Sequence, residues 1–151
     1  MALETVIFIV IALLVGSGYP IQAGINATLA QFQSHPLMAA FTNTTVASLV
    51  LIVVMVVFRV PLPSLGTLAG APWWAWTGGC LGAVFVLSAL VIAPKLGAAA
   101  FISTTIVGTM TASMIIDHFG LLAYKVQPVT TQRLLGAALV IAGMMLIQWR
   151  R

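Results

Sequence analysis

Charged side chains are almost absent from this sequence, and their absence limits the possible folds more than any other feature. Lysine, arginine, aspartate and glutamate together supply eight of the 151 residues, or 5%, whereas a soluble domain has about 25%. Because a chain with so little polar surface cannot cover itself against water, lipid must be its main solvent. We therefore expect an integral membrane protein.

The hydrophobic residues, 62% of the chain, gather in five long runs. A transmembrane helix needs about 20 mostly apolar residues, and the runs that satisfy this length cover about residues 5–29, 37–58, 73–92, 97–116 and 133–149. Barrel strands are excluded because the runs are too long and do not alternate. The sequence predicts an all-α integral membrane protein with five transmembrane helices, forming a single transmembrane domain over residues 1–151.

Prolines mark the expected connections, because a proline lacks the N–H that a helix interior uses. Of the seven prolines, only Pro20 falls inside an expected helix. We expect Ser34 to cap the second helix, with Pro36 in its first turn. The segment Ala93-Pro94-Lys95 is expected to join the third helix to the fourth.

Gly16, Gly18 and Pro20 lie near the middle of the first expected helix. Pro20 removes one backbone hydrogen bond, and the glycines lower the cost of bending. Broken helices near the membrane midplane often form transporter sites, because the freed backbone groups then face a cavity. The sequence therefore predicts a helix break with a gating role at these residues.

A polar stripe lies beside the predicted break. Tyr19, Gln22 and Asn26 are spaced i, i+3 and i+7, so they share one helix face. Burying an amide in hydrocarbon without a partner costs several kcal/mol, so this face must meet protein or water. The amides either hold helices together, as such residues commonly do, or line a substrate cavity. Because the polar stripe lies beside the predicted helix break, we favour the interpretation that it lines a substrate cavity.

The second expected helix begins with a polar segment. Its threonines, Thr42, Thr44 and Thr45, are expected to return their hydroxyls to the backbone one turn earlier. The Asn43 side chain bonds less easily to the backbone of its own helix. It therefore joins Tyr19 and the two amides of the first helix as a candidate substrate-binding residue.

Small residues at helical spacing allow close helix packing within a membrane. This spacing predicts helix or dimer packing at five glycines: Gly78, Gly82, Gly108, Gly136 and Gly143. The last two belong to the fifth expected helix, which is the candidate for a dimer seam.

No carboxylate lies deep in any expected helix, since Glu4 precedes the first and Asp117 ends the fourth. A proton-coupled exporter of cations normally keeps an intramembrane carboxylate, because one group can then take either a proton or the substrate. Asp117 lies at a helix C-terminus, the unfavourable end for an anion. We expect it to form an anchoring ion pair with Lys125 or Arg133.

Two classes of function are disfavoured by what the chain lacks. No nucleophile–base pair and no cluster of metal ligands occurs in the sequence, so we expect neither an enzyme nor a metal or other cofactor. The six basic residues are spread along the chain, so nucleic acid is not an expected partner. The expected partners are membrane lipid and a small-molecule substrate.

Five helices place the two termini on opposite sides of the membrane. One side then carries Arg59, Lys125 and Arg133, and the other carries Lys95, Arg150 and Arg151. The orientation of a membrane protein follows from which side carries more lysine and arginine, and here the two sides carry equal numbers. Either the surroundings of the chain set its topology, or the chain inserts in both orientations. The equal number of basic residues on the two sides favours this dual topology. Two oppositely inserted chains can pair into an inverted-repeat architecture.

Several segments resemble the bacterial YdcZ-type family of the drug/metabolite transporter superfamily. They are IQAGIN (21–26), GGCLGA (78–83), APKLG (93–97), ASMIIDHFG (112–120) and RLLG (133–136). The resemblance implies a five-helix half-transporter of the bacterial inner membrane that pairs antiparallel into a ten-helix dimer. It also implies alternating access around a cavity between the subunits, with Tyr19, Gln22, Asn26 and Asn43 as the site.

The resulting hypothesis is an alternating-access transporter of small organic molecules that works as an antiparallel homodimer. The related four-helix multidrug transporters use a first-helix glutamate that this sequence lacks, so we expect neutral, zwitterionic or anionic substrates, including aromatic ones. The alternative is a non-transporting membrane subunit or scaffold that assembles with another membrane protein.

The balanced charge count predicts that the chain inserts in both orientations. In a Cys80→Ser background, a single cysteine added after Arg151 should react with an impermeant maleimide in about half of the chains of intact cells, because neither side holds a lysine and arginine excess. Labelling of all chains, or of none, would show a single orientation and contradict the homodimer of opposed chains.

Overall fold

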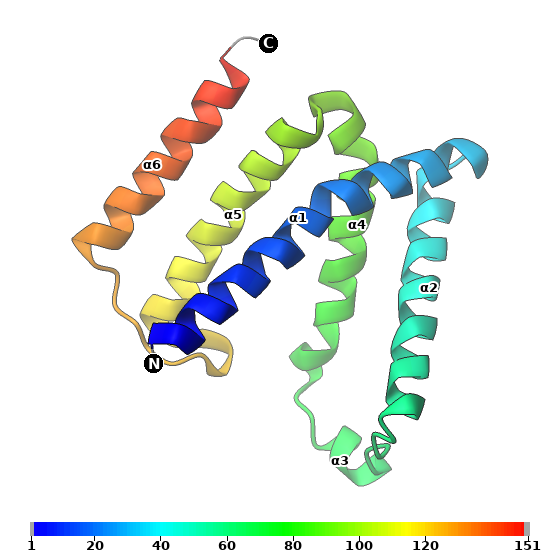
Figure 1. Ribbon diagram of the computed structural model, residues 1–151. Coiled ribbons are helices and arrows are strands. Elements are labelled where there is room, and N and C mark those ends of the chain that lie inside the picture. The colour runs from blue at the N-terminus through cyan, green and yellow to red at the C-terminus, as the bar shows by residue number, and fades with distance from the viewer. Residues whose placement is uncertain (1, 150–151) are drawn as a thin grey trace. The chain divides into compact units, whose positions relative to one another are not determined.

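The structure is a computed structural model, and it describes residues 2–149. Within this range, five helical spans are long and apolar enough to cross a membrane. They are α1 (Ala2–Phe32), α2 (Pro36–Val57), α4 (Gly78–Leu96) with the 3₁₀ helix η1 (Trp73–Thr77) before it, α5 (Ala98–Phe119) and α6 (Thr131–Gln148). Two short elements, α3 (Leu65–Ala69) and η2 (Leu121–Ala123), lie in the connections (Figure 1). The predicted all-α architecture with five spans is confirmed.

The helices bury very little of their surface against one another. Among residues 3–149, only eight side chains are buried: Ala23, Asn26, Ala39, Ala40, Leu90, Ala93, Ala100 and Phe101. Most of the large hydrophobic side chains are exposed around the whole circumference of their helices. A helix that is apolar on all sides requires lipid or another protein around it, as expected for a membrane protein.

The chain divides into two compact units. One contains the chain up to Pro20 and again from Lys95 onward, and the other is the continuous segment Ile21–Pro94. Both boundaries fall at a proline inside a helix, Pro20 in α1 and Pro94 in α4. We call the continuous segment the central unit and the other the terminal unit.

The predicted interruption of the first helix is not present, because α1 is one continuous helix of 31 residues through Gly16, Gly18 and Pro20. Proline removes only its own N–H from the helix. An interruption would leave several backbone groups without partners in the membrane, which is far more costly. A gating role for these three residues remains a prediction.

Pro94 was expected in a connection, and this is wrong, because it lies in the last turn of α4. The connection between α4 and α5 is the single residue Gly97, whose φ of 78° lies in the left-handed region. Glycine adopts this conformation at little steric cost. A one-residue turn is therefore possible at Gly97, and the helix before it can extend through Pro94.

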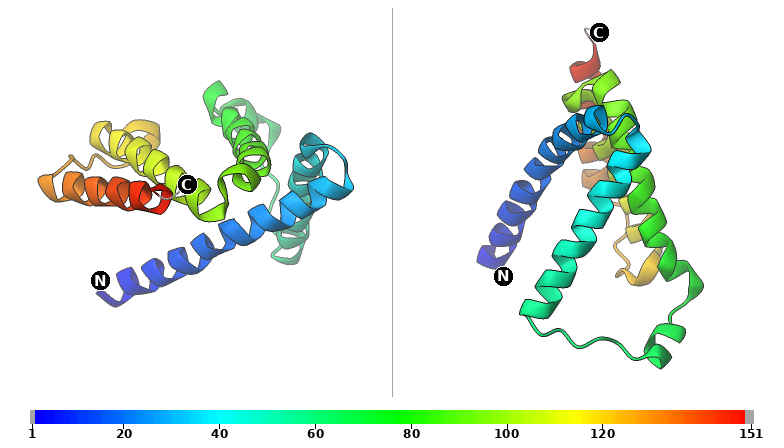
Figure 2. Two further views of the ribbon diagram at one scale, coloured as in Figure 1. Left: turned by 90° about the horizontal axis from the view of Figure 1, so that it is seen from above. Right: turned by 90° about the vertical axis from the view of Figure 1, so that its right-hand side faces the viewer.

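The core of the central unit lies where three of its helices meet. Ala39 and Ala40 of α2 pack with Leu90 of α4, and partly buried hydrophobic side chains surround them: Leu29 and Ala30 of α1, and Val86 and Leu87 of α4. The two alanines allow the helix backbones to approach closely. Away from this cluster, α2 and α4 diverge toward the connection that holds α3 (Figure 2).

The turn between α1 and α2 places a histidine, not the expected serine, at the cap of α2. Ser34 has a φ of 60°, and the extended residue before the helix is His35. Its imidazole Nδ1 accepts a hydrogen bond from the backbone N–H of Leu37 at 3.1 Å. Pro36 occupies the first turn, as expected. The left-handed turn at Ser34 therefore moves the capping position one residue along the chain.

In the terminal unit, α5 and α6 form a helical hairpin. The backbone carbonyl of Asp117 accepts hydrogen bonds from the N–H groups of Gly120 at 3.4 Å and Gln127 at 2.8 Å. Gly120 ends α5 in a left-handed conformation with a φ of 60°. Thr130 caps α6 by accepting the N–H of Arg133 at 3.3 Å. These contacts fold the 121–130 connection back across the end of α5.

Replacing Gly120 with alanine should destabilise this hairpin. The new Cβ would lie 2.6 Å from Cγ2 of Val126, and a left-handed conformation costs an L-residue about 1–2 kcal/mol. We expect at least that loss of unfolding free energy, measured by titrating the protein from mild micelles into dodecyl sulfate. Gly108→Ala, on the same helix with nothing within 4 Å, is the matched control. Equal stability of the two variants would contradict the prediction.

Candidate functional site

Three of the four predicted substrate-binding residues lie in the central unit, and they differ in exposure. Asn26 of α1 is buried, with 7% of its surface exposed, whereas Gln22 is exposed and Asn43 of α2 is half-buried. Tyr19 precedes Pro20 and so belongs to the terminal unit, where its side chain is 49% exposed. Asn26 is the one buried polar side chain among residues 3–149.

The Asn26 amide lies on the packed face of α1. Ala23 and Ala30, at i−3 and i+4 from it, are buried and partly buried, so the three side chains share one face. In the described part of the chain, no hydrogen bond to this amide is found, although no polar side-chain atom is completely enclosed without a partner. The amide therefore has unused hydrogen-bonding capacity for a ligand, water or a second chain.

Asn43 lies on the corresponding face of α2. It follows Ala39 and Ala40, which form the core of the central unit, by four and three residues, so helical spacing puts it on the same face. In the same way, Asn26 precedes Leu29 and Ala30, the residues of α1 that pack against this core. Each carboxamide is thus one helical turn beyond the core on its own helix.

A side-chain pair that the sequence did not indicate ties the turn after α1 to α2 beside Asn43. The Gln33 amide donates to the Thr42 hydroxyl at 2.9 Å, and that hydroxyl lies 3.3 Å from the Gln33 carbonyl oxygen. Thr42 was expected to bond to its own helix, as Thr44 and Thr45 do, and this expectation is wrong. The close approach of Gln33 offers Thr42 a partner that local sequence cannot reveal.

At the loop end of the α5–α6 hairpin, Asp117 and Arg133 form an ion pair. The Arg133 guanidinium lies 3.3 Å from the Asp117 carboxylate, and it also donates to the backbone carbonyl and the side-chain oxygen of Gln127. Each charge lies at the unfavourable end of its own helix but beside the favourable end of the neighbouring one. Lys125, the other predicted partner, is not part of this network in the described chain.

The opposite end of the hairpin is joined by a second side-chain hydrogen bond. The Gln148 amide of α6 donates to the Thr104 hydroxyl of α5 at 2.9 Å. The two residues are 44 positions apart, so sequence spacing gives no signal for the contact. Side chains therefore link α5 to α6 near both ends of the two helices.

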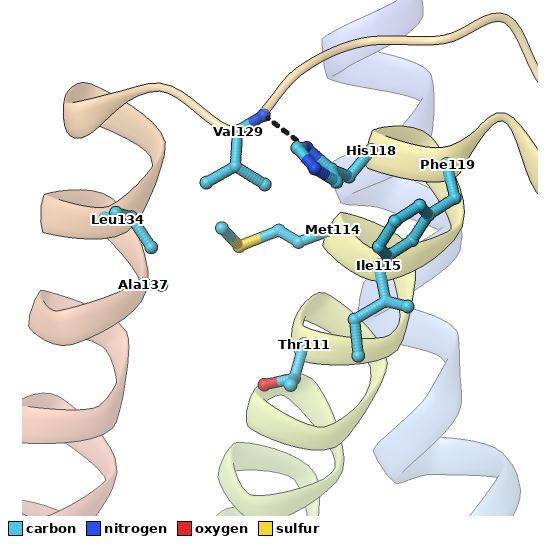
Figure 3. Close-up of a pocket in the computed structure, with 8 residues that line it drawn as sticks. All are labelled: Thr111, Met114, Ile115, His118, Phe119, Val129, Leu134 and Ala137. Carbon is cyan, nitrogen blue, oxygen red and sulfur yellow. Dashed lines mark hydrogen bonds between the residues drawn. The ribbon is translucent and has the colours of Figure 1, made fainter.

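Two hollows lie along the hairpin, and Met114 and Ala137 line both of them. The larger, of 380 Å³, is lined by Thr111, Met114, Ile115, His118, Phe119, Val129, Leu134 and Ala137 (Figure 3). The smaller, of 350 Å³, is lined by Met110, Ser113, Met114, Asp117, Arg133, Gly136, Ala137 and Val140. Both are largely apolar, and the larger has a polar corner at His118.

The glycines predicted to pack helices face open space. A Cβ added at Gly78, Gly82, Gly108, Gly136 or Gly143 would meet nothing within 4 Å. These surfaces are therefore free for another chain or for lipid. Their role in a dimer remains a prediction.

The ion pair gives a prediction that separates the two candidate partners of Asp117. In a double-mutant cycle, Asp117→Asn and Arg133→Gln should show a coupling energy of about 0.5–1 kcal/mol, because the pair is only partly exposed. Lys125→Gln, combined with Asp117→Asn, is the matched control and should show no coupling. Unfolding in mixed micelles measures both cycles, and coupling to Lys125 instead would contradict the observed pairing.

Comparison with known proteins identifies the family. No curated protein and no solved structure matches this chain. The family described as "Putative inner membrane exporter, YdcZ" matches residues 7–146, a stretch that includes nearly all of the five spans. The chain therefore belongs to the YdcZ family and is a multi-pass protein of the inner membrane.

Proposed function

We propose that this chain is an alternating-access transporter of small organic molecules, in which Gln22, Asn26 and Asn43 contact the substrate. Membership of an exporter family and five apolar spans support membrane transport. The observation that carries the site is the Asn26 amide, which is 7% exposed and has no hydrogen-bond partner in the described chain. The polar atoms of this amide are not completely enclosed, so a ligand can reach them and form the hydrogen bonds that burial otherwise makes costly to leave unmade.

The chemistry of these side chains favours substrates without a net positive charge. A carboxamide both donates and accepts hydrogen bonds but carries no charge. The carboxylates of the chain, Glu4 and Asp117, lie in the first turn of α1 and the last turn of α5, away from the middle of any span. We therefore propose neutral, zwitterionic or anionic substrates. Tyr19, three residues before Gln22 on the same helix, is the proposed aromatic contact.

We further propose that two chains of opposite orientation form the working unit. The small number of buried side chains and the open glycine surfaces leave ample apolar area for a second copy. Small residues at a surface favour helix association within lipid. The equal distribution of basic residues supports insertion in both orientations.

Removing the Asn26 amide tests the site. Asn26→Leu keeps a similar volume without hydrogen-bonding groups, and it should lower counterflow in proteoliposomes about tenfold or more, since an unmade bond to a buried group costs about 1–3 kcal/mol. The solute panel contains a neutral amide, an amino acid, an aromatic carboxylate and a quaternary ammonium ion. Thr28→Val is the matched control on the same helix, because the exposed Thr28 hydroxyl bonds only to the Gly24 carbonyl.

Cross-linking of the same samples separates transport from assembly. Normal dimer content with reduced counterflow supports the proposed site. Loss of the dimer in Asn26→Leu would instead support the scaffold alternative, in which the amide joins chains. Binding of the quaternary ammonium ion alone, in competition with protons, would contradict the proposed substrate class.

A further inference from the structure

His118 connects the end of α5 to the chain that leads into α6. Its imidazole Nδ1 accepts a hydrogen bond from the backbone N–H of Val129 at 3.2 Å, across eleven residues. Figure 3 shows the ring among the residues that line the larger hollow, turned toward the Val129 backbone nitrogen. Thr130, the cap of α6, follows directly. This bond therefore holds the connection at the point where α6 begins.

The bond requires one protonation state of the ring. A backbone N–H can only donate, so Nδ1 must carry a free electron pair and the ring proton must lie on Nε2. In the imidazolium both nitrogens carry protons, and the ring has no acceptor left. Protonation of His118 therefore breaks its bond to Val129. Histidine is the side chain whose charge ordinarily changes between about pH 5 and pH 8.

His118 is exposed, and the groups around its ring are mainly apolar. The hollow beside it is lined by apolar groups and the Thr111 hydroxyl, and the Phe119 ring lies edge-on at 4.8 Å. From α6, the lining residues are Leu134 and Ala137, neither of which ionises. Asp117, which precedes His118 in the chain, pairs with Arg133, and both line the other hollow.

The connection itself contains two further titratable side chains, Tyr124 and Lys125, and both are exposed. Protonated His118 would lie at the C-terminus of α5, where backbone carbonyls attract a cation. Other bonds hold the connection without the ring: the Gln127 N–H donates to the Asp117 carbonyl, and Arg133 donates to Gln127. Loss of the His118 bond therefore loosens the connection without separating the two helices.

We propose that His118 is a proton-operated latch on the 121–130 connection. The neutral ring holds the connection against the end of α5, and the protonated ring releases it. This places a response to protons at the membrane surface of a chain that has no carboxylate in the middle of a span. The inference goes beyond the proposed transport function and does not depend on it, because the latch operates without substrate.

A spin label in the connection tests the latch. In a Cys80→Ser background, Lys125→Cys carries a nitroxide, and the full chain is reconstituted in lipid nanodiscs. With His118 present, the spectrum should shift from a mainly immobile component at about pH 8 to a mainly mobile one at about pH 5. An unchanged spectrum across this range would overturn the proposal.

Three variants assign the response to the ring. His118→Asn keeps an acceptor near the position of Nδ1 but cannot titrate, so the label should stay immobile at both pH values. His118→Ala removes the acceptor, so the label should be mobile at both. His35→Asn is the matched control, because His35 makes the same kind of bond, to Leu37, outside this connection. A pH response that persists in His118→Asn, or disappears in His35→Asn, would overturn the assignment.

Discussion

The fold depends on the requirement that backbone hydrogen bonds be satisfied within the lipid, where no water can replace them. This requirement explains why α1 stays helical through two glycines and a proline, and why α4 continues through Pro94. In water, either proline could end a helix at little cost. In the membrane, losing one N–H at a proline is cheaper than opening a whole turn. The prolines therefore mark the limits of the two compact units, while the helices continue through them.

A second consequence concerns what holds the helices to each other. Since lipid is as apolar as the helix surfaces, burial contributes little, and the eight buried side chains form no extensive core. Polar side chains near the helix ends provide specific links instead: Gln33 with Thr42, Asp117 with Arg133, and Thr104 with Gln148. The last two pairs join consecutive spans, and the first joins the turn after α1 to α2. Links of this kind fix the helical hairpins and leave the remaining apolar surface for lipid and partner chains.

The sequence predicted the features that follow from local composition, and it missed those that follow from the approach of distant segments. Run lengths predicted five spans, because hydrophobic length alone decides whether a helix can cross the membrane. The cap of α2 was assigned one residue too early, since only the backbone shows that Ser34 is left-handed. The bonds of Gln33 and Gln148 arise from tertiary contacts. Asn26 is buried and Gln22 is exposed in the structure, although their spacing in the sequence places both on the same helix face.

These observations together divide the chemistry of the chain between the membrane interior and its surfaces. Asn26 and Asn43 lie within the spans and are uncharged, and an uncharged polar group costs less in the membrane than a charge does. The two histidines, His35 and His118, lie at helix ends, where each accepts a hydrogen bond from a backbone N–H. The proposed substrate site inside the membrane is therefore separate from the proposed proton-operated latch at its surface. A transporter with both proposed features would respond to pH without exchanging protons at its binding site.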